Sequence, residues 1–296
     1  MPPAAHCNLT TTPMAVIPRS VPLPDRTAPK EAYVMQTSNR SGGFFLIGGK
    51  SKTCFAVFLK LAGGSDAKIV VIPHASSVPS EAAADVVEQF ALLGARNVTV
   101  LEPPTLFRAR VASFLWKLGA RWLSRFVSDT VIPSGTDAVY ISGGDQDQLV
   151  EKLGAGGIAT LRAFSRAGGL VSGTSAGAAC MGNYMITGGM SDGAIRAGSL
   201  RTGRGLGLTG RILFDTHMKR NRFNRPIVAL ATLDMDAAFG LDEDTGVHIT
   251  NGTASVHGVG KVWYYRRGAD FGVDFSAGSA HGVNVEVLTA GGVIAI

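Results

Sequence analysis

A short apolar run that ends in Gly-x-Ser-x-Gly constrains the possible structures of this chain more than any other stretch does. Residues 170–172 favour a strand, Gly173, Ser175 and Gly177 follow, and small helix-forming residues come next. This is the pattern of a nucleophile elbow, a strained strand-to-helix turn that exposes a serine hydroxyl, with glycines where Cβ atoms would clash. The N–H after the serine lies at a helix N-terminus, where it can stabilise an oxyanion. A glycine-rich turn whose serine only caps the helix is the alternative.

The surrounding chain alternates strands and helices. Apolar strands are predicted at residues 44–47, within 68–73, and at 97–101, 137–142 and 211–214. Helices are predicted at 53–61, at 80–93 with Ser80 as the cap, at 148–153, at 157–167 and at 226–233, and a loop at 191–210. This alternation is typical of an α/β fold with a parallel sheet and right-handed crossovers. From residue 247 onwards, short β-like runs alternate with glycine turns and predict an extra β-rich segment.

Two segments stand apart from this pattern. Residues 1–40 are rich in proline and predict an extended or disordered lead-in, which leaves 41–296 as a single α/β domain. Residues 105–128 repeat apolar side chains at helical spacing, with basic residues between them. We expect an amphipathic helical insert there, which packs on the domain. A dimer contact or a membrane-surface helix is the alternative.

The composition excludes several classes of protein. Hydrophobic residues make up 46% of the 296 residues and charged residues 17%, which is typical of a globular protein with a sizeable core. The cysteines Cys7, Cys54 and Cys180 are scattered and form neither a disulfide framework nor a metal-binding pair. No run of about 18 apolar residues and no signal-peptide pattern is present, so we expect a cytoplasmic protein. The net charge of +6 permits an acidic substrate, nucleic acid or an anionic membrane surface.

A serine hydroxyl needs a base to take its proton, and the base needs an orienting group. His217 follows the strand at 211–214 and can therefore reach the rim that holds Ser175. Glu243 is the candidate orienter, in an acidic run that also contains Asp242 and Asp244. The order Ser, His, acid differs from the order Ser, acid, His of α/β-hydrolases. His248 and His257, which follow the acidic run, keep that second order open.

Three arginines follow the candidate base. Because guanidinium groups pair with carboxylates, Arg220, Arg222 and Arg225 suggest an anionic substrate, with a basic surface patch as the alternative. A nucleic-acid site would need interleaved aromatic side chains, and only Phe223 is present in this stretch.

Four motifs stand out along the chain: Gly-Gly-Asp-Gln at 143–146, Gly-Thr-Ser-Ala-Gly-Ala at 173–178, Asp-Thr-His at 215–217 followed by Arg-x-Arg-x-x-Arg, and Asp-Glu-Asp-Thr at 242–245. Taken in this order, they resemble the cyanophycinase family of serine peptidases, peptidase family S51, which includes aspartyl dipeptidase. The resemblance spans about residues 43–265. The family pattern often has Gln where this chain has Thr216, and its histidine-to-arginine spacing is one residue longer.

The resemblance implies a flavodoxin-like, class I glutamine-amidotransferase-like α/β fold and a homodimer without metal or cofactor. It implies a catalytic triad of Ser175 as nucleophile, His217 as base and Glu243 as the acid. It also implies that the N–H groups of Gly144 and Ala176 form the oxyanion hole. The implied substrate-binding residues are Gln146, Asp215, Thr216, Arg220, Arg222 and Arg225. The implied reaction is hydrolysis of cyanophycin, multi-L-arginyl-poly-L-aspartate, to β-Asp-Arg dipeptides. A dipeptidase for Asp-containing peptides and a catalytically silent binding protein are the alternatives.

Overall fold

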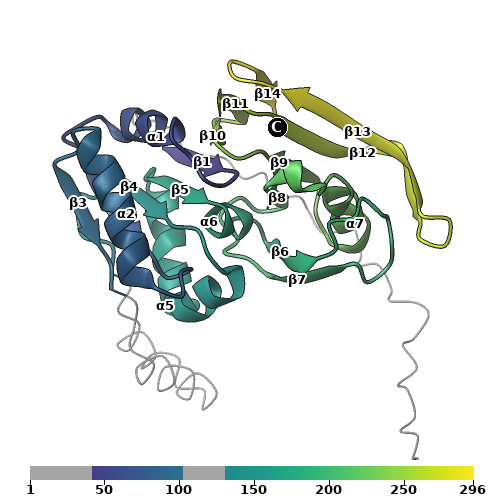
Figure 1. Ribbon diagram of the computed structural model, residues 1–296, viewed down its shortest axis with the longest axis horizontal. Helices are drawn as coiled ribbons and strands as arrows, with labels where there is room; N and C mark the ends of the chain where they lie inside the picture. The colour runs from purple at the N-terminus through teal and green to yellow at the C-terminus, as the bar shows by residue number, and fades with distance from the viewer. Residues whose placement is uncertain (1–41, 103–130) are drawn as a thin grey trace, which may run out of the picture. The chain divides into compact units, whose positions relative to one another are not determined.

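Five neighbouring parallel strands form one side of the main sheet (Figure 1). The computed structural model describes residues 42–102 and 131–296. The main sheet has eight strands in the order β14-β11-β10-β1-β5-β4-β2-β3. The parallel strands are β1 (Gly43–Ile47), β2 (Lys68–Ile72), β3 (Asn97–Val100), β4 (Ala138–Ile141) and β5 (Leu170–Thr174). The predicted α/β fold with a parallel sheet is therefore confirmed.

Helices cover both faces of this sheet, which explains why β1 and β4 are buried at every position. On one face Phe45 and Ile47 pack with α1 (Cys54–Ala62) and α2 (Pro79–Leu92). On the other face Leu46 packs in the same cluster as the side chains of α5 (Gln146–Arg166). Because successive strand residues point to opposite faces, a strand between two helical layers needs apolar residues at consecutive positions.

One helix prediction needs correction. Helix α2 begins at Pro79 with Val78 at the N-cap, so Ser80 is not the cap. Proline suits the first turn, where its missing N–H has no helical partner. The two helices expected at 148–153 and 157–167 are the two parts of α5, which is interrupted at Gly154, whose φ of 57° and ψ of −177° are not helical. Its start is capped by Asp145, whose carboxylate accepts the Gln148 N–H.

The stretch predicted as loop at 191–210 contains a strand. Strand β7 (Leu200–Arg204) pairs antiparallel with β6 (Tyr184–Gly189) in a separate two-stranded sheet. Glycine and arginine are not typical of strands, but pairing with β6 supplies backbone partners that the sequence pattern does not reveal.

A second sheet follows, in the order β13-β12-β9-β8. Its strands are β8 (Ile212–Thr216), β9 (Ala237–Leu241), β12 (Val262–Asp274) and β13 (Ser279–Leu288). The 3₁₀ turn η1 (Met218–Arg220) and helix α7 (Asn224–Thr232) separate β8 from β9. Strands β10 (Thr245–Thr250), β11 (Thr253–Gly258) and β14 (Val293–Ala295) return to the main sheet as antiparallel strands. The predicted β-rich C-terminal segment is therefore confirmed.

The predictions for 1–40 and 105–128 lie outside the described residues, and the single domain at 41–296 stays a prediction. Within the described part of the chain, no helix is both long enough and apolar enough to span a membrane.

Phe90 of α2 offers a test of the packing between helix and sheet. Its ring is fully buried against Phe55, Phe58 and Tyr140, with ring centroids 5.2–5.4 Å apart. We expect Phe90→Ala to lower the free energy of unfolding by about 3–5 kcal/mol, because the cavity cannot refill. Urea unfolding measures this change. Leu92→Ala on the same helix is the control: Leu92 is 74% exposed, and a comparable loss there would contradict the packing argument.

Candidate active site

Ser175 lies on a strained turn between β5 and the short helix α6 (Ala176–Ala179). Its backbone has φ 52° and ψ −113°, an uncommon conformation for a residue with a side chain. The flanking glycines are sterically required: a Cβ on Gly173 would lie 2.3 Å from the Gly177 carbonyl oxygen, and one on Gly177 would lie 2.5 Å from the Ile141 carbonyl oxygen. The local geometry is therefore that of the predicted elbow, and the serine side chain accepts no cap hydrogen bond from the helix.

The structure brings Ser175, His217 and Glu243 into one hydrogen-bonded row. Ser175 Oγ lies 2.8 Å from His217 Nε2, and His217 Nδ1 lies 2.9 Å from Glu243 Oε1. His217 directly follows β8 and has the left-handed backbone conformation, with φ 58° and ψ 45°. The end of β8 is aligned with the end of β9, since Thr216 pairs with Leu241. Because of this register, the residues that follow β8 and the residues that follow β9 lie next to each other at the same end of the second sheet.

The charges in this row suit a proton acceptor. Burial lowers the pKa of His217, Arg220 and Arg222 lower it further, and the hydrogen bond to Glu243 opposes them. The pKa of Glu243 is also lowered, chiefly by its hydrogen bond to His217, so this side chain is a carboxylate. A carboxylate only accepts, so His217 donates from Nδ1 and leaves the Nε2 lone pair for the serine hydroxyl.

The two acidic neighbours of Glu243 have other partners. Asp242 is buried, and its Oδ2 accepts the Lys261 N–H at 3.1 Å. Asp244 Oδ1 accepts four hydrogen bonds from residues 51–53, two from backbone N–H groups and two from hydroxyls, at 2.6–2.9 Å. Of the three acidic side chains left open by the sequence, Glu243 is the one hydrogen-bonded to His217.

The Gly-Gly turn after β4 lies directly against the serine. A Cβ on Gly143 would lie 3.3 Å from Ser175 Cβ, and one on Gly144 would lie 2.1 Å from the Ala75 carbonyl oxygen. Gly144 has φ 144°, which favours glycine. The turn and the start of α6 therefore bring the Gly144 and Ala176 backbones to the rim where Ser175 lies. The nearby Gln146 side chain donates to the Ile186 carbonyl at 2.9 Å.

The three predicted arginines differ in exposure. The Arg220 side chain is 61% exposed and lies 3.5 Å from Glu243 Oε1. Arg222 is partly buried and donates to the Thr216 carbonyl at 3.0 Å. Arg225 is buried, and its Nε lies 3.0 Å from Oδ2 of the equally buried Asp215. Burial raises the pKa of Asp215 while Arg225 and Arg222 lower it.

The loop after β1 is a part of the site that the sequence pattern did not reveal. The Gly48 carbonyl accepts the His217 N–H at 3.0 Å, and the Ile47 carbonyl accepts the Ser175 N–H at 2.9 Å. A Cβ on Gly49 would lie 2.6 Å from His217 Cε1 and 2.9 Å from Glu243 Cγ. The signal in the sequence was a Gly-Gly pair at the end of an apolar strand, on the rim where ligands bind in such sheets.

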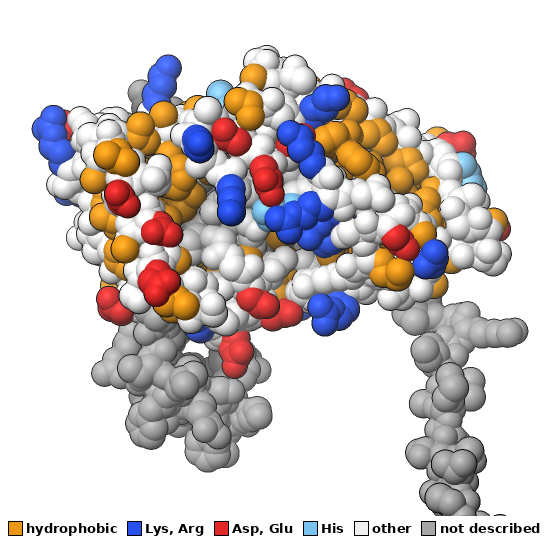
Figure 2. Space-filling model, in the orientation of Figure 1, with side chains coloured by type: hydrophobic (Ala, Val, Ile, Leu, Met, Phe, Trp, Pro, Cys, Tyr) orange, Lys and Arg blue, Asp and Glu red, His pale blue; other side chains and the backbone are white. Residues whose placement is uncertain are grey.

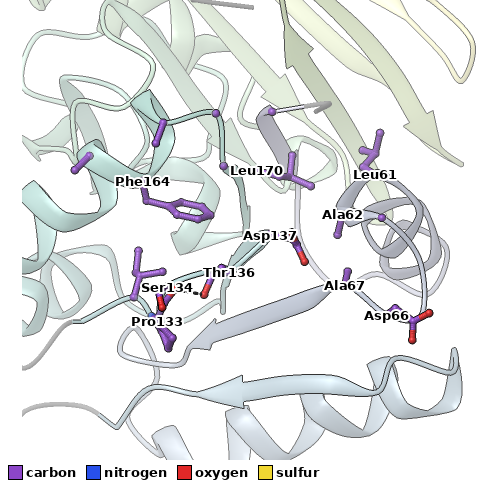
Figure 3. A pocket seen from close by; sticks show the side chains of 18 of the residues that line it. Leu61, Ala62, Asp66, Ala67, Pro133, Ser134, Thr136, Asp137, Phe164 and Leu170 are labelled. Atoms are coloured by element: carbon purple, nitrogen blue, oxygen red, sulfur yellow. Dashed lines mark hydrogen bonds between the residues drawn. The ribbon is translucent and has the colours of Figure 1, made fainter. Parts of the chain in front are cut away.

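A separate hollow lies at the opposite end of the main sheet (Figure 3). Its volume is about 880 Å³, and residues at the starts of β1, β4 and β5 line it, among them Gly42, Asp137 and Leu170. It contains none of the row Ser175–His217–Glu243. Within the described residues, no three His, Cys, Asp or Glu side chains cluster as metal ligands would.

Comparison with known proteins identifies relatives. The model of peptidase family S51 matches residues 123–257. The chain is 31% identical to the cyanophycinase of Synechococcus elongatus over 236 residues, which are 77% of this chain and 69% of that protein. It is 32% identical to the cyanophycinase of Trichormus variabilis over 209 residues, 69% of this chain. The latter match spans only 65% of the length of that relative.

The fold has a counterpart among solved structures. A crystal structure of a peptidase from an acI-B1 actinobacterium superposes with a TM-score of 0.57 and 18% identity, and covers 86% of this chain and 97% of that one. At this identity the likeness concerns the fold alone.

The protonation of His217 can be measured directly. Because Arg220 lowers the pKa of His217, we expect Arg220→Gln to raise that pKa, so that the imidazole gains its proton at a higher pH. An NMR titration of the His217 Cε1–H resonance reports the midpoint. Arg96→Gln, at an exposed arginine paired with Asp66, is the control for a general loss of positive charge. A His217 midpoint that stays the same in both variants would contradict the assigned role of Arg220.

Proposed function

Because this chain belongs to peptidase family S51, we propose that it is a serine exopeptidase that hydrolyses cyanophycin to β-Asp-Arg dipeptides. The observation that carries this proposal is the hydrogen-bonded row from Ser175 Oγ through His217 to Glu243. The cyanophycinase relatives support the choice of substrate.

The reaction proceeds through an acyl-enzyme. Ser175 Oγ attacks the peptide carbonyl carbon while its proton moves to His217 Nε2, and Glu243 stabilises the imidazolium that forms. The Gly144 and Ala176 N–H groups donate to the oxyanion. His217 then returns the proton to the leaving amine. Water, deprotonated by His217, hydrolyses the ester and regenerates Ser175.

The charges around the row suit a substrate with carboxylates. Arg220 is exposed beside Glu243, so we assign to it direct contact with a substrate carboxylate, with Arg222 behind it. Arg225 is paired with Asp215 inside the protein. We assign to this pair and to Thr216 the task of holding the loop that carries His217. We assign Gln146, which follows the oxyanion turn, to the substrate site as well. On family grounds we also propose that the protein acts as a homodimer in the cytoplasm.

The decisive experiment compares two substrate classes. Insoluble cyanophycin and Asp-containing dipeptides are incubated separately with the protein, and mass spectrometry detects β-Asp-Arg or free amino acids. We expect β-Asp-Arg from cyanophycin, no product with Ser175→Ala, and a loss of at least about 10³-fold in rate with His217→Ala. If only the dipeptides are hydrolysed, the protein is a dipeptidase and not a cyanophycinase. The absence of product from both, together with no labelling of Ser175 by a fluorophosphonate, would indicate a silent binding protein.

Gly49 provides a test of the positioning of the row. An added Cβ would displace the His217 ring and the Glu243 side chain, so we expect Gly49→Ala to lower kcat about 10²-fold or more. Steady-state kinetics measure the effect, and the urea midpoint shows whether the fold persists. Gly64→Ala is the matched control, since Gly64 also has positive φ but has no atom within 4 Å of its added Cβ. Equal losses in both variants would mean that backbone strain, and not the clash with His217, is responsible.

A further inference from the structure

The Gly-Gly turn after β4 lies between the nucleophile and the loop that follows β2, residues 73–76. An added Cβ on Gly143 would lie 3.3 Å from Ser175 Cβ, whereas one on Gly144 would lie 2.1 Å from the Ala75 carbonyl oxygen. No side chain therefore separates the turn from either neighbour. Three of the four loop residues are buried, so the loop belongs to the protein interior that supports the turn.

Two backbone donors beside Ser175 are left without an acceptor. Within the described part of the chain, neither the Gly144 N–H nor the Ala176 N–H donates a hydrogen bond to a protein group. The N–H groups of the adjacent residues Asp145 and Ser175, by contrast, donate to backbone carbonyls at 2.8 and 2.9 Å. The two unengaged donors are the pair assigned above to the oxyanion, so the position of the turn decides where one of them points.

Helix α5 holds the loop that supports the turn. The Lys152 Nζ donates to the Ser76 carbonyl at 3.2 Å and to the Gln148 side chain. The N–H of Asp145, the N-cap of α5, donates to the Ala75 carbonyl at 2.8 Å. One helix therefore binds two successive carbonyls of the loop, one through its backbone and one through a lysine side chain.

The charge of Lys152 has no ion-pair partner. Among the residues that the structure describes, no carboxylate lies within 4.0 Å of its Nζ. In Figure 2, Lys and Arg side chains gather around a histidine near the middle of the face, whereas mostly Asp and Glu side chains lie over α2 and α5. Lys152 is partly buried, and burial lowers its pKa. Because partial burial of a charge is unfavourable, its hydrogen bonds to the Ser76 carbonyl and Gln148 offset this cost.

We propose that Lys152 is a positioning residue for the oxyanion hole. By binding the Ser76 carbonyl, it keeps the loop at 73–76 against Gly144, and the loop in turn fixes the direction of the Gly144 N–H. The inference rests on the proposed function in that the Gly144 and Ala176 N–H groups stabilise the oxyanion. Such donors stabilise a transition state only while they are held in place. A looser loop therefore slows the chemical step and leaves ground-state binding unchanged.

The reaction of the full-length protein with a fluorophosphonate tests the oxyanion hole without a peptide substrate. Ser175 Oγ bonds to phosphorus, fluoride leaves, and the P=O oxygen takes the place of the oxyanion. We expect Lys152→Met, which removes the ammonium donor, to lower the second-order rate constant of labelling about ten-fold, since outright loss of an oxyanion donor costs about 10²–10³-fold. Lys152→Arg keeps a cationic donor and is expected to recover part of this loss. Arg166→Met, at an exposed position in the last turn of the same helix, is the matched control.

Two NMR measurements distinguish positioning of the hole from a general structural role. In 31P NMR of the labelled protein, we expect the adduct resonance of Lys152→Met to move toward its position in the urea-denatured adduct, because the P=O oxygen accepts weaker hydrogen bonds. We expect the titration midpoint of His217 in the unlabelled protein to stay the same, since Lys152 is not among the groups that shift the pKa of His217. The urea midpoint shows whether the fold persists.

The outcomes separate this inference from the proposed function. Slower labelling and a moved 31P resonance in Lys152→Met, but not in Arg166→Met, support the role of Lys152 even if no peptide is hydrolysed. Equal labelling rates in these two variants overturn it, even if cyanophycin is hydrolysed. A shifted His217 midpoint in Lys152→Met also overturns it, because the substitution then acts on the base. If the unsubstituted protein is not labelled at all, both the proposed function and the role of Lys152 are overturned.

Discussion

The close approach of several backbones at Gly48 and Gly49 is the constraint on which the candidate site depends. The Ile47, Gly48 and Gly49 carbonyls accept, in that order, the Ser175 N–H, the His217 N–H and the Thr174 hydroxyl. A Cβ on Gly48 would lie 2.0 Å from the Asp242 carbonyl oxygen. Because neither glycine has a side chain, the ends of β1, β5, β8 and β9 can meet there. A substituent at either position would separate the serine from its base.

This meeting point joins two sheets. Ser175 follows β5 of the main sheet, whereas His217 follows β8 of the second sheet. Glu243 lies in the connection from β9 to β10, where the chain passes from the second sheet back to the main one. The side chains on either side of Glu243 hold the adjacent loops, so the same three-residue connection orients His217 and holds the backbones of Lys52 and Lys261.

Much of the site could be predicted from local patterns. The elbow around Ser175, the Gly-Gly turn after β4 and the histidine after a strand each depend on a few neighbouring residues, because glycines and strand ends fix the backbone locally. The loop assigned to 191–210 was wrong for the opposite reason, since β7 exists only through its pairing with β6. The sequence also predicted the same role for all three arginines after His217. No local pattern shows that Arg225 is buried against Asp215 while Arg220 is exposed.

The sequence by itself determined the α/β fold, the elbow at Ser175, the candidate base His217 and the acidic run at 242–244, because periodicity and turn chemistry are local properties. Only the tertiary structure decided which of the three consecutive acidic side chains reaches His217. The backbone path between β9 and β10 determines which side chain this is, and hydrogen bonds to residues distant in sequence hold that path. Because the side chains of neighbouring residues point in different directions, a different backbone path would bring a different carboxylate to the imidazole of His217.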